Sequence, residues 1–156
     1  RLLNAFGFSM AGAGGVMILY GLGGLFYSQM AKRWLALLGE KGLALAGGAL
    51  IACGLLVLAW ATQPWLAAGS CFFAGLGFYM LHNTLQTQAT QMAPESRGTA
   101  VSLFACVLFL GQSLGVVVIA TRADRGALTS AFSVVAVGML LLGAWVSHHV
   151  KARKMA

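Results

Sequence analysis

A chain of 156 residues in which 60% are hydrophobic and only 8% are charged is too apolar for an ordinary soluble domain, which carries about 25% charged residues. Its ten basic and three acidic side chains give a net charge of +7, and all of them lie at the chain ends or in short breaks between apolar runs. A nucleic-acid-binding protein would instead gather basic residues on one face. The composition therefore predicts a protein embedded in a lipid bilayer that does not bind nucleic acid.

Four stretches of the chain contain no charged residue: 2–31, 42–94, 98–121 and 126–150. A helix needs about 20 apolar residues to cross a bilayer, so the second stretch is long enough for two crossings. Thr62-Gln63-Pro64-Trp65 is the break between these two, because proline suits a first helical turn and tryptophan suits the membrane interface. We predict an all-α bundle of about five transmembrane helices, one domain over residues 1–156, with spans at about 9–31, 42–62, 65–91, 98–121 and 127–149.

The basic residues divide unequally between the two sides of such a bundle. With five spans, the breaks 32–41 and 92–98 and the C-terminal tail share one side, which carries seven of the ten basic residues. Only Arg1, Arg122 and Arg125 lie on the other side. Lysine and arginine accumulate in cytoplasmic loops, so we predict that the C-terminus is cytoplasmic.

The third predicted span, 65–91, is the most polar. At about 100° per residue, one of its faces carries an aromatic and polar stripe, made of Phe72, Gly75, Tyr79, His82, Asn83, Gln86 and Thr90. Polar side chains are costly in hydrocarbon unless they face the bundle interior or a wet cavity, so the stripe indicates a substrate cavity. The candidate cavity residues are Phe72, Tyr79, His82, Asn83 and Gln86, of which Tyr79 and Asn83 lie nearest the middle of the span. The alternative is an interface in which His82, Asn83 and Gln86 bond to neighbouring helices.

Gly111 and Gly115 form a GxxxG pattern in the fourth predicted span. In a membrane, small residues let helix backbones approach closely, so we predict that these two glycines pack against another helix. A second interpretation is that such close contacts let helices slide or rock past one another.

Residues for catalysis or metal binding are scarce. All three acids lie in loops, and His82 is the candidate titratable group within a span. There are no paired carboxylates, no Ser-His-Asp set and no HExxH motif. Cys53, Cys71 and Cys106 lack the spacing of metal ligands. We therefore predict no enzyme, no cofactor and no metal site.

Two stretches together resemble the major facilitator superfamily of transporters. Pro94-Glu95-Ser96-Arg97-Gly98-Thr99-Ala100 resembles the P-E-x-R-G-x-A element at the cytoplasmic turn between family helices ten and eleven. Tyr20-Gly21-Leu22-Gly23-Gly24-Leu25, followed by Lys32-Arg33 and Gly39-Glu40-Lys41, resembles helix eight and the loop after it. Ala36 and Leu37 stand where the family's loop pattern has Asp and Arg.

The resemblance covers nearly the whole chain, and it implies that the five spans correspond to family helices eight to twelve. It implies a secondary transporter of the twelve-helix drug and metabolite efflux branch, located in the bacterial inner membrane and working by alternating access. The expected partners are a small-molecule substrate, the lipid bilayer and the N-terminal helices of the same transporter. The alternative function is a non-transporting membrane scaffold or subunit with five spans.

Overall fold

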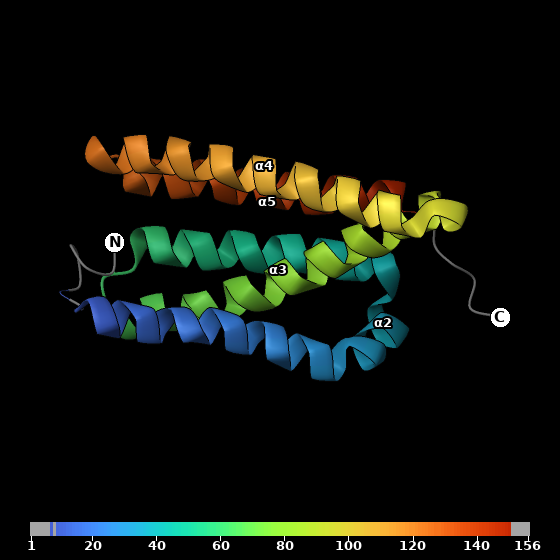
Figure 1. Ribbon diagram of the computed structural model, residues 1–156. Helices are drawn as coiled ribbons and strands as arrows, with labels where there is room; N and C mark the ends of the chain where they lie inside the picture. The colour runs from blue at the N-terminus through green and yellow to red at the C-terminus, as the bar shows by residue number, and fades with distance from the viewer. Residues whose placement is uncertain (1–6, 8, 151–156) are drawn as a thin grey trace.

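The computed structural model describes residue 7 and residues 9–150, which form an all-α fold (Figure 1). Its elements, in chain order, are α2 (Met10–Trp60), α3 (Pro64–Met92), the short 3-10 helix η1 (Pro94–Ser96), α4 (Arg97–Asp124) and α5 (Leu128–His149). The four α-helices are each long and apolar enough to cross a membrane. The all-α prediction is therefore confirmed, and so is the prediction of long apolar helices that could cross a membrane.

Among the described residues there are four long helices and not five, because the first two predicted spans belong to one helix, α2. The prediction that residues 32–41 form a loop between two helices is wrong. Leucine and alanine are strong helix formers, and they dominate the segment between Trp34 and Gly39, so the helix continues past the charged residues. Only Gly39 leaves the helical conformation, with φ 64° and ψ 177°.

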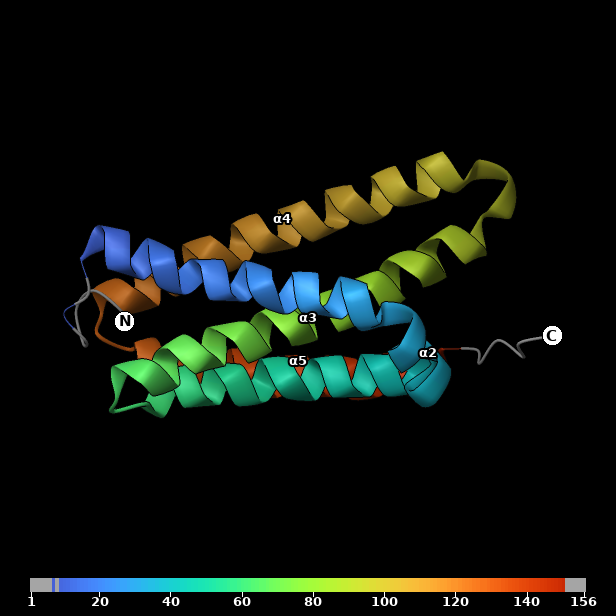
Figure 2. The ribbon, with the colours of Figure 1, turned by 90° about the horizontal axis from the view of Figure 1, so that it is seen from below.

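The backbone at Gly39 bends α2 back on itself. The first arm, residues 10–38, and the second arm, residues 40–60, run in opposite directions (Figure 2). A straight helix of 51 residues would be about 76 Å long, more than twice the roughly 30 Å of a bilayer's hydrocarbon core. The bend therefore makes α2 compatible with a membrane.

The other predicted ranges coincide with helices. The predicted break before Pro64 is confirmed, since α2 ends at Trp60 and α3 begins with Pro64 in its first turn. The ranges 65–91, 98–121 and 127–149 match α3, α4 and α5 to within three residues at either end.

Figure 1 shows how the connections are distributed between the two ends of the bundle. The bend of α2, the turn from α3 to α4 and the end of α5 lie at one end, which we call the bend end. The start of α2 and the connections from α2 to α3 and from α4 to α5 lie at the opposite end. The breaks 32–41 and 92–98 therefore share one end, as the sequence predicted. The basic residues of the tail, 151–156, lie outside the described residues.

Glycines hold the second arm of α2 between α3 and α5. A Cβ atom at Gly47 would lie 2.8 Å from the carbonyl oxygen of Gly77 on α3, and one at Gly77 would lie 2.6 Å from the carbonyl oxygen of Gly47. On the other side, a Cβ at Gly48 would lie 2.8 Å from the Cα of Gly143 on α5. These backbones touch directly, and any larger residue at these positions would force the helices apart.

The first arm packs against the opposite side of α3. A Cβ atom at Gly23 would collide with the backbone of α3 at Phe72 and Leu76, and one at Gly75 would collide with the backbone of Tyr20. The buried side chains of Tyr27, Leu43, Leu76 and Met80 form a hydrophobic cluster where the two arms and α3 meet. α3 is thus the helix that both arms of α2 contact.

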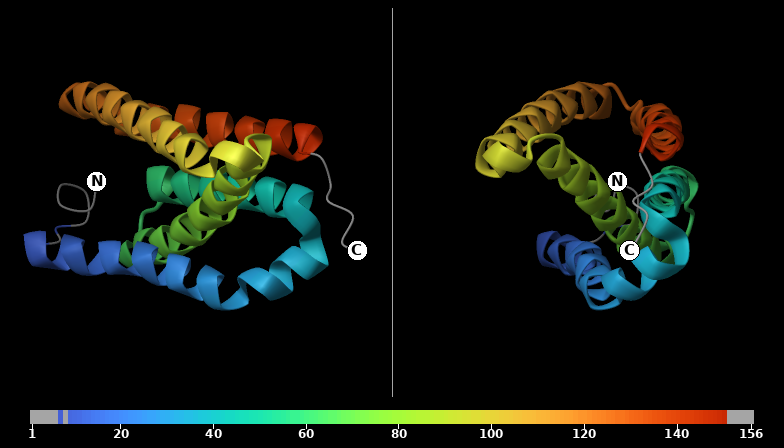
Figure 3. Two further views of the ribbon diagram at one scale, coloured as in Figure 1. Left: turned by 45° about the vertical axis from the view of Figure 1, so that its right-hand side comes forward. Right: turned by 90° about the vertical axis from the view of Figure 1, so that its right-hand side faces the viewer.

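Helix α4 stands apart from this group, as the end-on view in Figure 3 shows. None of its residues is buried against the described part of the chain. Large apolar side chains such as Leu110 and Leu114 are more than 60% exposed. This degree of apolar exposure suits a helix surrounded by lipid or by helices of another chain.

Candidate functional site

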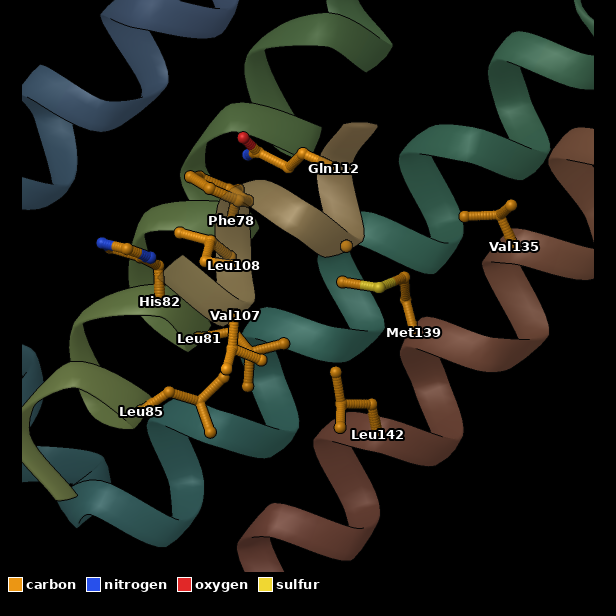
Figure 4. A pocket seen from close by; sticks show the side chains of 11 residues that line it. Phe78, Leu81, His82, Leu85, Val107, Leu108, Gln112, Val135, Met139 and Leu142 are labelled. Carbon is orange, nitrogen blue, oxygen red and sulfur yellow. The ribbon is translucent and has the colours of Figure 1, made fainter. Parts of the chain in front are cut away.

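A cavity of about 510 Å³ opens between α3, α4 and α5, and we call it the central cavity (Figure 4). Its volume falls within the roughly 300–1,000 Å³ of sites that hold drug-sized ligands. Its lining is almost entirely apolar, with His82 and Gln112 as its polar side chains; the full lining is Phe78, Leu81, His82, Leu85, Val107, Leu108, Gly111, Gln112, Val135, Met139 and Leu142. The cavity therefore favours a mainly hydrophobic occupant.

His82 lies at the edge of the central cavity between two aromatic rings. Its imidazole stacks on Phe78, with ring centroids 5.4 Å apart and an interplanar angle of 15°, and lies 5.4 Å from the ring of Phe104 on α4. Its Nδ1 atom is buried and has no hydrogen-bond partner among the described residues. A buried polar atom without a partner costs about 1–3 kcal/mol, which marks His82 as a functional candidate.

The earlier residues of the stripe on α3 face the first arm of α2. The ring of Tyr79 lies over Gly24, where a Cβ atom would collide with it, and 37% of Tyr79 is exposed. The ring of Phe72 lies 6.1 Å from that of Phe26 and packs against the hydrophobic cluster around Tyr27. The structure thus places Phe72 in a helix–helix interface and leaves Tyr79 partly open.

Asn83 lines a second, smaller cavity at the bend end, which we call the bend pocket. This pocket has a volume of about 170 Å³ and lies between the two arms of α2 and α3. Its lining is Tyr27, Ala31, Lys32, Leu35, Glu40, Leu43, Asn83, Thr84 and Thr87. Beside it, the Nε2 atom of Gln88 donates a hydrogen bond of 2.5 Å to the Glu40 carboxylate, which ties the start of the second arm to α3.

Of the predicted stripe, His82 and Asn83 line the two cavities described above, and they line different ones. His82 and Asn83 are neighbours in sequence but point about 100° apart around the helix, so one lines the central cavity and the other the bend pocket. Gln86 is half-buried one turn further along α3. The hydroxyl of Thr90 donates to the backbone carbonyl of Thr87, 2.7 Å away. Whether these residues contact a substrate stays a prediction.

The predicted loop residues lie on the surface, whereas Gly111 borders the central cavity and Gly115 is exposed. Pro94 and Glu95 belong to η1, Arg97 and Gly98 begin α4, and all four are exposed at the bend end. A Cβ atom at Gly111 or at Gly115 would meet nothing within 4 Å, so no described helix packs closely on this GxxxG pattern. The predicted packing of the two glycines stays a prediction.

Sequence reasoning missed two groups of residues. Lys32 and Glu40 were assigned only to a charged loop, and nothing in their spacing indicated that a bend at Gly39 would bring both to one pocket. Gly77 and Gly143 make backbone contacts that were not predicted either. The sequence feature that could have indicated these contacts is the abundance of glycine within apolar stretches. It indicates close packing of helices but does not identify which helices meet.

No protein-family model, no curated protein and no solved structure matches this chain.

Proposed function

We propose that this chain is part of a secondary transporter that moves a small organic molecule across a membrane by alternating access. The observation that carries this proposal is the position of α3, whose adjacent residues His82 and Asn83 line two cavities within an apolar helical bundle. Polar side chains at such positions in membrane proteins usually face a substrate or ion pathway. The resemblance of two sequence stretches to the major facilitator superfamily supports the same function.

In this proposal the two arms of α2 cross the membrane separately, which gives five crossings. At 1.5 Å per residue, residues 10–38 and 40–60 are about 43 and 31 Å long, so each can span a hydrocarbon core of about 30 Å. The bend at Gly39 then lies at the membrane surface, beside Lys32, Arg33 and Lys41. The proposed location is the bacterial inner membrane, with the bend end in the cytoplasm.

Fusions of a reporter enzyme test this topology. A reporter that is active only in the cytoplasm is expected to be active when fused after Ala156 or inserted next to Gly39. The same reporter is expected to be inactive when inserted near Gln63 or Asp124, which lie at the opposite end of the bundle. Activity near Gln63 together with inactivity next to Gly39 would contradict the proposed orientation, and equal activity at the two sites would contradict the hairpin of α2.

Single cysteines on α3 test the proposed cavity. In the protein with Cys53, Cys71 and Cys106 replaced by alanine, cysteines at Tyr79, His82 and Asn83 are expected to react with a membrane-impermeant thiol reagent about tenfold faster than a cysteine at Met80. Met80 is 3% exposed, lines neither cavity and serves as the matched control on the same turn of the helix. The measurement is the labelling rate in intact cells and in inverted vesicles.

A specific observation favours the alternative function, a membrane scaffold or subunit. Helix α4 has no residue buried against the described chain and exposes large apolar side chains such as Leu110 and Leu114, as a helix that binds other membrane proteins would. A scaffold needs no aqueous path along α3. Labelling at Tyr79, His82 and Asn83 as slow as at Met80 from both sides of the membrane would therefore exclude the transport proposal and favour the scaffold.

A further inference from the structure

The bend pocket brings opposite charges together from both sides of the Gly39 bend. Lys32 lies on the first arm of α2, and Glu40 is the first residue of the second arm. α3 contributes an amide from Asn83 and a hydroxyl from Thr87. From this combination we infer that the bend pocket binds a small zwitterion that carries one ammonium and one carboxylate group.

The two charged side chains of the bend pocket have hydrogen-bonding positions that a ligand could occupy. The ammonium of Lys32 offers three donors, and no hydrogen bond or ion pair joins it to another described residue. The Glu40 carboxylate accepts one hydrogen bond, from Gln88, and its two oxygens provide further acceptor positions. Because Lys32 and Glu40 are not paired with each other in the described structure, each is available to a ligand group of the opposite charge.

The two signs of charge select the class of ligand. A simple anion would be attracted by Lys32 and repelled by Glu40, whereas a simple cation would be attracted by Glu40 and repelled by Lys32. A zwitterion can satisfy both groups at once. The amide of Asn83 can both donate and accept, so it can orient either end of such a ligand.

The size of the pocket limits the ligand to a small molecule. Its volume of about 170 Å³ lies well below the roughly 300–1,000 Å³ of sites for drug-sized ligands. An amino acid with a short side chain, or with none, fits this description. The site lies at the bend end, apart from the central cavity, and the inference does not depend on transport.

Calorimetric titration of the purified full-length chain tests the inference. The probes are glycine, β-alanine and 4-aminobutyrate, which separate the same two charges by increasing distances. At least one of them is expected to bind with a saturable heat signal, while acetate and methylammonium at equal concentrations do not. Absence of binding by all three zwitterions would overturn the inference. Binding of acetate as tight as that of the best zwitterion would also overturn it, because the pocket would then be a simple anion site.

Four single substitutions test whether the zwitterion binds in the bend pocket. Lys32→Gln and Glu40→Gln are each expected to weaken the binding of the best zwitterion by about tenfold or more, because each removes one charge-assisted contact. Glutamine at position 40 still offers an oxygen that can accept the hydrogen bond from Gln88, so the fold should persist. The controls are Arg33→Gln and Lys41→Gln, which remove neighbouring charges that do not line the pocket.

The thermal unfolding temperature of each variant serves as a second measurement. Unchanged unfolding temperatures with selective loss of binding in the Lys32 and Glu40 variants would support the inference. Equal weakening by all four substitutions would overturn it, because binding would then depend on the general charge of the bend end.

Discussion

Substitution of Gly47 by alanine is expected to destabilise the protein by about 2 kcal/mol or more. The added Cβ would lie 2.8 Å from the carbonyl oxygen of Gly77 and 2.8 Å from the backbone nitrogen of Leu81. Both are backbone atoms of α3, so no side-chain rotation can relieve the collision, and the two helices must separate. Gly47→Leu is expected to have a larger effect for the same reason.

Gly111→Ala is the matched control for this prediction. The same chemical change at Gly111 meets open space, and alanine favours a helix over glycine by about 1 kcal/mol. Gly111→Ala is therefore expected to leave the stability of the chain unchanged or to raise it slightly. Urea unfolding in detergent micelles, followed by circular dichroism, measures both variants. Equal destabilisation by the two substitutions would show that a partner outside the described structure packs on Gly111, or that α2 and α3 do not pack as the structure shows.

Substitution of Gly39 by alanine is expected to disrupt the hairpin of α2 at a cost of about 1–3 kcal/mol. The φ of 64° and ψ of 177° at Gly39 lie in a region that is essentially restricted to glycine. A Cβ at this position would meet no atom within 4 Å, so the effect comes from the backbone conformation alone. Alanine also favours a continuous helix, which would carry the first arm away from α3.

Spin labels at Met10 and Trp60 measure this change, because both residues are exposed and lie at the same end of the folded bundle. In the native protein the two labels are expected to be close together. In Gly39→Ala a second population is expected at longer distances, up to about 75 Å for a straight helix. The control is Gly15→Ala, a glycine within the first arm with open space around it. An unchanged distance distribution in Gly39→Ala would contradict the role assigned to Gly39.

The sequence was sufficient to locate most of the helices, because their ends carry strong local signals. Pro64 cannot continue a preceding helix without losing a hydrogen bond, and the charged residues near Arg97 and Arg125 interrupt the apolar runs. The bend of α2 could not be predicted in this way. Charged residues interrupt an apolar run without interrupting a helix, so the segment between Trp34 and Gly39 remained helical and a single glycine made the turn.

The candidate site was predictable only in part. The helical period placed His82 and Asn83 at neighbouring positions about 100° apart around α3, because this placement depends on local geometry alone. It could not show that His82 and Asn83 border different cavities, which depends on where α2, α4 and α5 pack. Glycine contacts were unpredictable for the same reason. No described residue packs closely on the GxxxG pattern of α4. Gly47 and Gly48, which follow no such pattern, contact α3 and α5.

The isolation of α4 has a consequence for how the protein is inserted into a membrane. The most apolar 18 residues of Pro94–Asp124 have a mean hydropathy of 2.4, the highest among the four candidate spans, and none of them is buried within the described part of the protein. The most apolar 18 residues of α3 have the lowest mean hydropathy, 1.3, and 44% of them are buried. If the four helices span a bilayer, α4 would partition into lipid by itself during synthesis, whereas α3 would be held there largely by its packing against α2. The translocation machinery would release α4 as an independent unit and retain α3 until its helical partners are in place.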